Sequence, residues 1–228
     1  MDKQTLKQKA SMENAISICE YQSVGEEIAN SVTHGIGTLF GIVALVLLIA
    51  FTNTNQIAWR ITSFSIYGAS LIFLYVVSTL FHSLRRGRTK LIFKTLDHAA
   101  IYVLIAGSYT PVTLILMRHS WCGWTLLGIV WAMAIAGIIL KVFFEDKLKS
   151  LSVLFYLAMG WLVMVAFKPL AAAAPAGFIL WLLLGGICYT LSIIFYGWHK
   201  LPYHHTIFHI LILAGSVSHF FGFFRYLT

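Results

Sequence analysis

Histidines spaced four residues apart suggest metal chemistry in otherwise apolar parts of this chain. His205 and His209 have this spacing, so on a helix they share one face, with side chains about 6 Å apart. Ser78 and His82 share a face for the same reason. Neutral imidazoles bind a divalent ion at about 2.0–2.1 Å, and three of them with one water molecule form an open, catalytic type of zinc site. Two distant stretches of the chain therefore supply ligands for such a site.

Two further polar residues have side chains that suit a reaction at such an ion. Asp97 could hydrogen-bond to a metal-bound water and act as a general base, and Ser78 could polarise a carbonyl or orient a ligand. The segment from His205 to His209 lacks the glutamate of the HExxH protease motif, so that reaction does not transfer to this chain. Interhelical hydrogen bonds that hold a bundle together are the alternative, and the spacing alone leaves both open.

The composition predicts the elements that position these residues. A soluble domain is about 45–50% apolar and about 25% charged, whereas this chain of 228 residues is 59% hydrophobic and 11% charged. Its apolar stretches are long enough to cross the ~30 Å hydrocarbon layer as helices and too long for barrel strands. We predict an all-α membrane protein, a bundle of seven transmembrane helices. The predicted spans are 28–52, 57–83, 93–117, 121–143, 151–170, 176–198 and 203–225.

Charge predicts how the bundle is oriented. With seven spans, twelve lysines and arginines fall on the side of the N-terminus and four on the other side. This excess places the N-terminus in the cytoplasm and the C-terminus outside. We therefore expect a cytoplasmic N-terminal segment over 1–27 and a transmembrane domain over 28–228. The net charge of +8 is attributed to basic loops, not to a nucleic-acid partner.

The predicted topology also brings the polar residues to one depth. His82 falls at the cytoplasmic end of the second span, and Asp97 falls about one turn inside the third. His205 and His209 fall in the first two turns of the seventh span, which also starts at the cytoplasm. Three helices thus place polar groups near the inner leaflet, which favours a shared site over a random scatter. A count of six or eight spans would separate these groups.

Other histidines in the spans are less suited to ligation. His219 lies ten residues after His209, about 15 Å further along a helix, which is too far to join the same ion. His98 adjoins Asp97 but points about 100° away from it, so packing is favoured. His34 shares a face with Asn30 and Glu27 at the cytoplasmic start of the first span and is either a packing residue or a support for the site.

The motifs resemble those of the hemolysin III family, the bacterial branch of the progestin and adipoQ receptor proteins, which is related to the alkaline ceramidases. The resemblance runs from about residue 24 to 224. It rests on four segments: Ser78–His82, Leu96–Asp97 followed by Gly107–Pro111, His205–His209 and Glu27–Gly35.

The resemblance implies a role for each of the polar residues. By this likeness His82, His205 and His209 ligate Zn²⁺, Asp97 contacts the zinc-bound water, and Ser78 supports the site from outside the ligand set. The resemblance also implies a multi-pass protein of the bacterial plasma (inner) membrane.

Three functions remain open from the sequence. The first is a zinc-dependent hydrolase that cleaves an amide or ester bond in membrane lipids. The second is a pore-forming cytolysin, as the family name asserts, although a pore needs a polar lining through the whole membrane. The third is a structural or regulatory protein of membrane homeostasis with a structural zinc. Membrane lipids are the expected partners in each case, nucleic acid is not expected, and the oligomeric state is open.

Overall fold

Seven long apolar helices make up the described part of the chain. The computed structural model describes residues 22–55, 57–144 and 149–228. Within these residues every regular element is helical, and seven helices are long and apolar enough to cross a membrane. These spans are Val24–Ala50, Ile57–Ser83, Arg88–Leu116, Trp121–Phe143, Leu151–Ala173, Ala176–Tyr196 and His204–Tyr226. The predicted all-α, seven-helix class is thereby confirmed. Residues 1–21, which make up most of the expected N-terminal segment, lie outside the described part.

The third and fifth spans consist of more than one helical segment. The elements in chain order are α2 (Val24–Ala50), α3 (Ile57–Ser83), α4 (Arg88–Pro111), the π-helical η2 (Val112–Leu116), α5 (Trp121–Phe144), α6 (Lys149–Trp161), the 3₁₀ segment η3 (Leu162–Ala166), α7 (Phe167–Ala173), α8 (Ala176–Tyr196) and α9 (His204–Tyr226).

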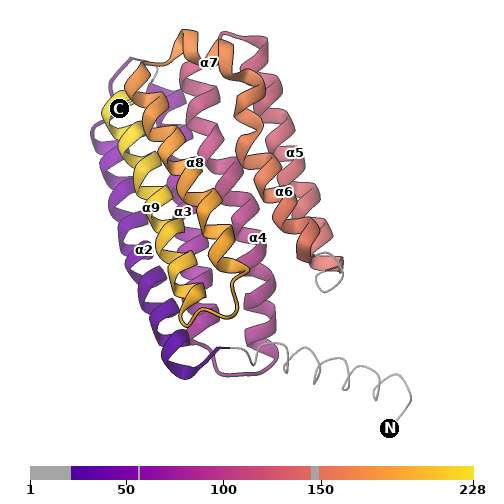
Figure 1. The fold of residues 1–228 in the computed structure, drawn as a ribbon. Helices are drawn as coiled ribbons and strands as arrows, with labels where there is room; N and C mark the ends of the chain where they lie inside the picture. Colours follow the sequence, from indigo (N-terminus) through magenta and orange to yellow (C-terminus); the bar gives the residue numbers. More distant parts are fainter. Residues whose placement is uncertain (1–21, 56, 145–148) are drawn as a thin grey trace.

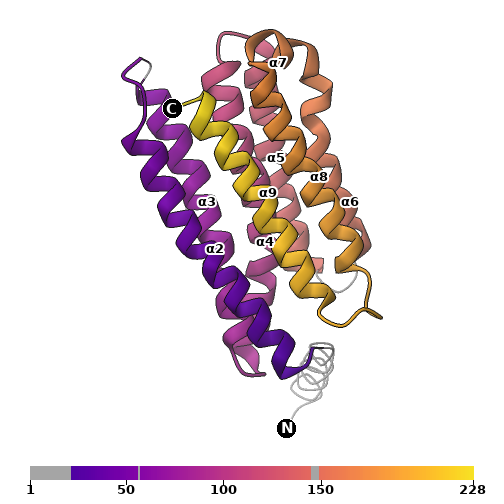
Figure 2. The same cartoon turned by 60° about the vertical axis from the view of Figure 1, so that its left-hand side comes forward.

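The helices run side by side as one bundle, in which α9 lies between α2 and α8 (Figures 1 and 2). On the other side of α2, α3 packs against both α2 and α4, and α4 continues the bundle to α5. Helices α2 and α9 begin at the lower end of Figure 1, and α3 ends there. We call this the histidine end, because the histidine pair of α9 and His82 of α3 lie there. Residues far apart in sequence therefore meet at one end.

Helix α2 begins four residues before the predicted span. Ser23 caps it: the Ser23 hydroxyl accepts from the Glu26 backbone N–H at 3.2 Å, and the Glu26 carboxylate accepts from the Ser23 backbone N–H at 2.8 Å. This reciprocal capping box satisfies two N–H groups that an open helix end would leave without partners. The buried residues of α2 form a single stripe along the helix: Asn30, His34, Gly37, Gly41, Ala44 and Leu48. The extension gives α2 a polar first turn directly at the histidine end.

Two lysines counted on the predicted cytoplasmic side are buried. The sequence assigns Lys90 to the loop between the second and third spans, but α4 already begins at Arg88, and Lys90 is only 4% exposed. Lys141 lies within α5, is also 4% exposed and lines a cavity. The position of Lys90 differs from the prediction because α4 begins before the apolar run of the third span.

The breaks in the third and fifth spans face each other. Pro111 lacks a backbone N–H, and the chain continues beyond it as the π-helical η2. In the fifth span, α6 gives way to η3 after Trp161. The Tyr109 hydroxyl donates to the Met159 carbonyl at 2.8 Å and accepts from the Val163 backbone N–H at 2.9 Å. One side chain of α4 thus satisfies the backbone groups that the break in the fifth span exposes, as apolar surroundings require.

Candidate metal centre

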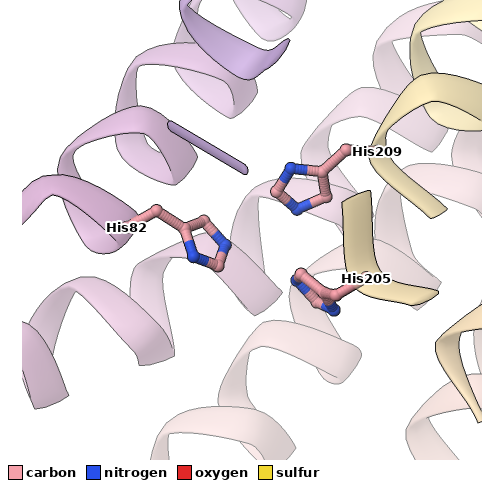
Figure 3. A group of neighbouring side chains, drawn as sticks. All are labelled: His82, His205 and His209. Atoms are coloured by element: carbon pink, nitrogen blue, oxygen red, sulfur yellow. The ribbon is translucent and has the colours of Figure 1, made fainter. Parts of the chain in front are cut away.

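Three histidines from two helices meet at the histidine end. His82 comes from the last turn of α3, and His205 and His209 come from the first turns of α9. Figure 3 shows the His82 ring facing the two rings of α9. The potential ligand atoms, one from each ring, all lie within 4.8 Å of one another. Ring centroids are 4.6 Å apart for His205 and His209, and 4.9 and 5.2 Å from His82 to His209 and His205.

The donor set fits a transition-metal ion. The Nε2 atoms of His82 and His205 are buried and have no hydrogen-bond partner, and such unpartnered buried groups are rare and costly in proteins. Two nitrogens that bind one ion at about 2.1 Å lie at most about 4.2 Å apart, so small side-chain rotations suffice to close the set. Imidazole ligands suit zinc, copper, iron or nickel more than magnesium or calcium. The cluster could therefore hold a metal ion.

Glu27 of α2 holds the His82 ring from behind. Its Oε2 lies 2.7 Å from His82 Nδ1, and its Oε1 accepts from Lys90 Nζ at 2.8 Å. Lys90 also donates to the Leu84 carbonyl at 3.2 Å. The sequence prediction assigns no role to Glu27. The signal that could have found it is the spacing of Glu27, Asn30 and His34 on one face of a helix that starts earlier than expected.

The same face of α2 also contacts α9, the helix that carries His205 and His209. The Asn30 backbone carbonyl lies 3.3 Å from His209 Nδ1, and the Asn30 side-chain oxygen accepts from the Thr206 hydroxyl at 2.6 Å. The His34 ring stacks on His209, with centroids 3.5 Å apart and planes inclined by 10°. His34 therefore packs directly on one histidine of the cluster.

Asp97 and Ser78 lie on the wall of a cavity that two of the histidines share. The cavity has a volume of about 170 Å³ and is lined by parts of α2, α3, α4, η2, α5, α6, η3, α7, α8 and α9. His205 and His209 line it together with Asp97 and Ser78, and the remaining lining is mostly apolar. The Ser78 hydroxyl is buried and forms no close hydrogen bond, and Asp97 is near enough to interact with both Ser78 and His82. Four of the five predicted site residues therefore line one cavity, and the fifth, His82, lies against His205 and His209.

Sequence comparison then identifies the family. The profile described as "Haemolysin-III related" matches residues 22–220. The chain belongs to this family. The matched region includes α2 to α8 and most of α9, and with them every residue of the candidate centre. Seven apolar helices and this membership make the haemolysin-III related chain a multi-pass integral membrane protein of the bacterial plasma membrane.

Curated relatives of this haemolysin-III related chain cover most of its length. It is 50% identical over 200 residues to "Hemolysin-3 homolog" of Bacillus subtilis (strain 168), and the aligned region covers 87% of this chain and 93% of that protein. It is 48% identical over 201 residues to "Hemolysin-3" of Bacillus cereus, which spans 88% and 91%. A more distant relative is the human "Monocyte to macrophage differentiation factor", at 27% identity over 219 residues, or 89% and 84% of the two chains.

The remaining histidines of this family member lie outside the cluster. His219 Nε2 lies 3.3 Å from the Leu182 carbonyl, and His219 is not part of the group that could hold a metal. His98, expected from the sequence only to pack, lines the cavity with Asp97, and its backbone carbonyl accepts from the Tyr156 hydroxyl at 2.9 Å. The hydrogen bond from Tyr156 joins α6 to α4 at this level, and the expectation that the His98 side chain packs stays a prediction.

Proposed function

We propose that this haemolysin-III related protein is a zinc-dependent hydrolase that cleaves an amide or ester bond in a membrane lipid. One observation carries the proposal: two histidines of a metal-binding group share a buried, largely apolar cavity with a carboxylate and an unpartnered hydroxyl. Metal-dependent hydrolysis needs a Lewis acid, a base and a group that orients the carbonyl. The cavity wall carries residues suited to each of these three parts: histidines to hold the metal, a carboxylate as the base and a hydroxyl to orient the carbonyl.

Each side chain has a separate role in this proposal. His82, His205 and His209 hold the zinc ion. Zinc in an open three-histidine site supplies an acidified water molecule and stabilises negative charge on a carbonyl oxygen. Asp97 accepts the proton of the attacking water and returns it to the leaving group. The Ser78 hydroxyl donates a hydrogen bond to the substrate carbonyl, which would give that buried hydroxyl the partner it lacks.

The cavity supports a lipid as the substrate. Its lining continues from the histidine end along the bundle to apolar side chains such as Leu104, Leu170 and Leu182. An apolar wall of this kind accepts a hydrocarbon chain by the hydrophobic effect and keeps bulk water away from the reacting bond. A soluble polar substrate would lose its hydration there without compensation.

The test combines metal content with hydrolysis. Wild-type protein, purified in detergent, is expected to contain about one zinc per chain and to hydrolyse a fluorescent ceramide or a fluorescent acyl ester lipid. Asp97→Asn is expected to keep the zinc and to lose about 10²–10⁴-fold in rate, the range for a general base. His209→Ala is expected to lose both, and His119→Ala, in an exposed turn, neither. Equal rates in wild type and Asp97→Asn would refute the mechanism.

A second candidate function comes from the relatives. Two of them carry the name hemolysin, which favours cytolysis through a pore. A single chain of this kind offers a mostly apolar cavity, so a pore would require an assembly of several copies. Conductance across a planar bilayer that rises with protein concentration, unchanged in Asp97→Asn, would favour the pore. Loss of the fold on chelation, with every lipid left intact, would instead favour a structural zinc.

A further inference from the structure

We infer that the first turns of α2 form the positioning element of the metal centre, with Glu27 fixing the His82 ring and the Asn30 carbonyl fixing His209. This inference rests on the metal binding proposed above but not on the proposed hydrolysis. Helix α2 contributes none of the three histidines, yet it contacts one ligand on α3 and another on α9. It thereby gives tasks to Glu27 and Asn30, to which the sequence pattern assigns none.

The hydrogen-bond partners decide which nitrogen of His82 carries the proton. An ionised carboxylate only accepts hydrogen bonds, and Glu27 stays ionised because the Lys90 ammonium occupies its other oxygen. His82 Nδ1, at 2.7 Å, therefore carries the hydrogen and donates it to Glu27. A metal ion binds the ring through its other nitrogen, and Nε2 is the His82 atom that is buried without a partner. A carboxylate behind a histidine in this way sets its tautomer and makes it a stronger metal ligand.

Contacts from α2 also set the tautomer of His209 and restrict the rotation of its ring. A backbone carbonyl has two lone pairs, so Asn30 can accept from its own helix and from a side chain as well. Its carbonyl lies 3.3 Å from His209 Nδ1, which places the hydrogen on Nδ1 and leaves Nε2 for a metal. The stacked His34 ring restricts rotation of His209, and the bond from Thr206 to Asn30 holds α9 against α2. Two ligands on different helices thus take the same tautomer from one element.

Glu27 does this only as a carboxylate. It receives two donors, His82 Nδ1 and Lys90 Nζ, and offers one oxygen to each. Glutamine at this position would have a single acceptor oxygen, and its NH₂ group would face one of the two donors. The His82 ring would then lose its fixed partner although size and shape barely change. A role limited to tying α2 to α4 would concern Lys90 and leave the His82 tautomer unaffected.

The experiment measures metal affinity and tautomer in the full-length protein. Glu27→Gln is compared with wild type, and Glu26→Gln serves as the matched control, because Glu26 sits at the same helix end but bonds to Ser23 and the Tyr203 backbone. Zinc affinity is measured by competition with a chelator, and Co²⁺ absorption reports ligand geometry. The ¹⁵N NMR shifts of the His82 ring, recorded without metal, report the tautomer.

The expected result is a 10–100-fold weaker zinc affinity in Glu27→Gln, the usual loss when the partner of a ligand histidine is removed. Its Co²⁺ spectrum should also change, and its His82 should become a mixture of tautomers. Glu26→Gln should match wild type in all three. Lys90→Met, which leaves Glu27 on His82, should keep the Nδ1–H tautomer even where the protein becomes less stable.

Several outcomes would overturn the inference. One is a Glu27→Gln protein with wild-type zinc affinity and an unchanged His82 tautomer. Another is an Nε2–H tautomer of His82 in the wild-type protein, a result that does not depend on any variant being able to fold. Wild-type protein that binds neither zinc nor cobalt would refute the metal binding on which both proposals rest. Zinc binding without hydrolysis would refute the proposed hydrolysis alone, because the affinity and tautomer comparison of Glu27→Gln would still decide the role of α2.

Discussion

Unsatisfied buried polar atoms concentrate at the candidate centre. Among the described residues, five of the seven buried side-chain nitrogen and oxygen atoms without a partner belong to His34, Ser78, His82 and His205. Elsewhere in the bundle similar groups are bonded: the Ser216 hydroxyl accepts from Tyr75 at 2.7 Å and lies 3.0 Å from the Tyr189 hydroxyl. A buried polar group without a partner costs stability. The presence of several such groups at the candidate centre therefore indicates that a bound ligand supplies their missing partners.

Ser78→Ala separates stability from function at the residue scale. The Ser78 hydroxyl has no partner, so its removal takes away a buried group that is already unsatisfied. We expect the unfolding temperature to stay the same or to rise. If Ser78 orients the substrate carbonyl, the rate of lipid hydrolysis should fall about 10²-fold, as for loss of one donor at a reacting oxygen.

A matched control lies on the same helix. The buried Ser70 hydroxyl donates to the Tyr67 carbonyl at 2.7 Å and does not line the cavity. Ser70→Ala should therefore keep the wild-type rate. A marked fall in unfolding temperature in Ser78→Ala, with an unchanged rate, would contradict the assignment of Ser78 to the reaction.

At the scale of elements, the two broken spans depend on each other. The π segment η2 follows Pro111, and the break between α6 and η3 lies against Tyr109, two residues before that proline. Residues of both breaks line the cavity, among them Val112 and Val163. Irregular backbone at membrane depth is tolerated where protein buries it or a cavity adjoins it. The Gly107–Pro111 motif thus shapes the cavity, because Ser108 and Tyr109 line it and the Tyr109 hydroxyl holds the broken backbone of the fifth span.

Tyr109→Phe tests this dependence. The change removes the hydroxyl bonded to the Met159 carbonyl and the Val163 N–H. We expect a loss of about 1–3 kcal/mol in the free energy of unfolding, because buried backbone groups lose their partner. The measurement is thermal or denaturant unfolding in detergent. Tyr226→Phe is the control, since no hydrogen bond of its hydroxyl is found among the described residues, and equal stability of the two variants would contradict the proposed role.

At the scale of the whole molecule, orientation follows from charge. Burial of Lys90 and Lys141 removes two of the twelve basic residues counted on the predicted cytoplasmic side. Ten against four is still a clear excess, so the prediction of a cytoplasmic N-terminus and an external C-terminus stands. In that orientation the histidine end faces the cytoplasm, and a lipid of the inner leaflet would have the shortest path to the metal centre.

Reporter fusions test the orientation. Alkaline phosphatase needs disulfides that form only outside the cytoplasm, so a fusion after Thr228 should be active in a bacterial host. A fusion after Lys200, in the loop before α9, should be inactive, and its expression level is checked by immunoblot. The reverse pattern would invert the bundle and place the metal centre on the outer side.

Local properties of the sequence determined the number of spans and the identity of the three histidines. Hydropathy over about 20 residues predicts a membrane helix, and a spacing of four places His205 and His209 on one face. With seven spans, the end of the second span and the start of the seventh span lie at the same depth in the membrane. None of these inferences needs to know how one helix packs on another.

Only the tertiary structure decided what surrounds the three histidines. Glu27 lies 55 residues before His82, and Asn30 lies 179 residues before His209. Their contacts depend on where α2 begins and which face it turns towards α3 and α9, and Lys90 is buried by the same packing. Periodicity along one helix assigns a residue to a face but leaves the neighbour of that face undetermined. The three histidines that could hold a metal ion can therefore be read from the sequence, whereas the residues that contact them from α2 follow from the packing of the bundle.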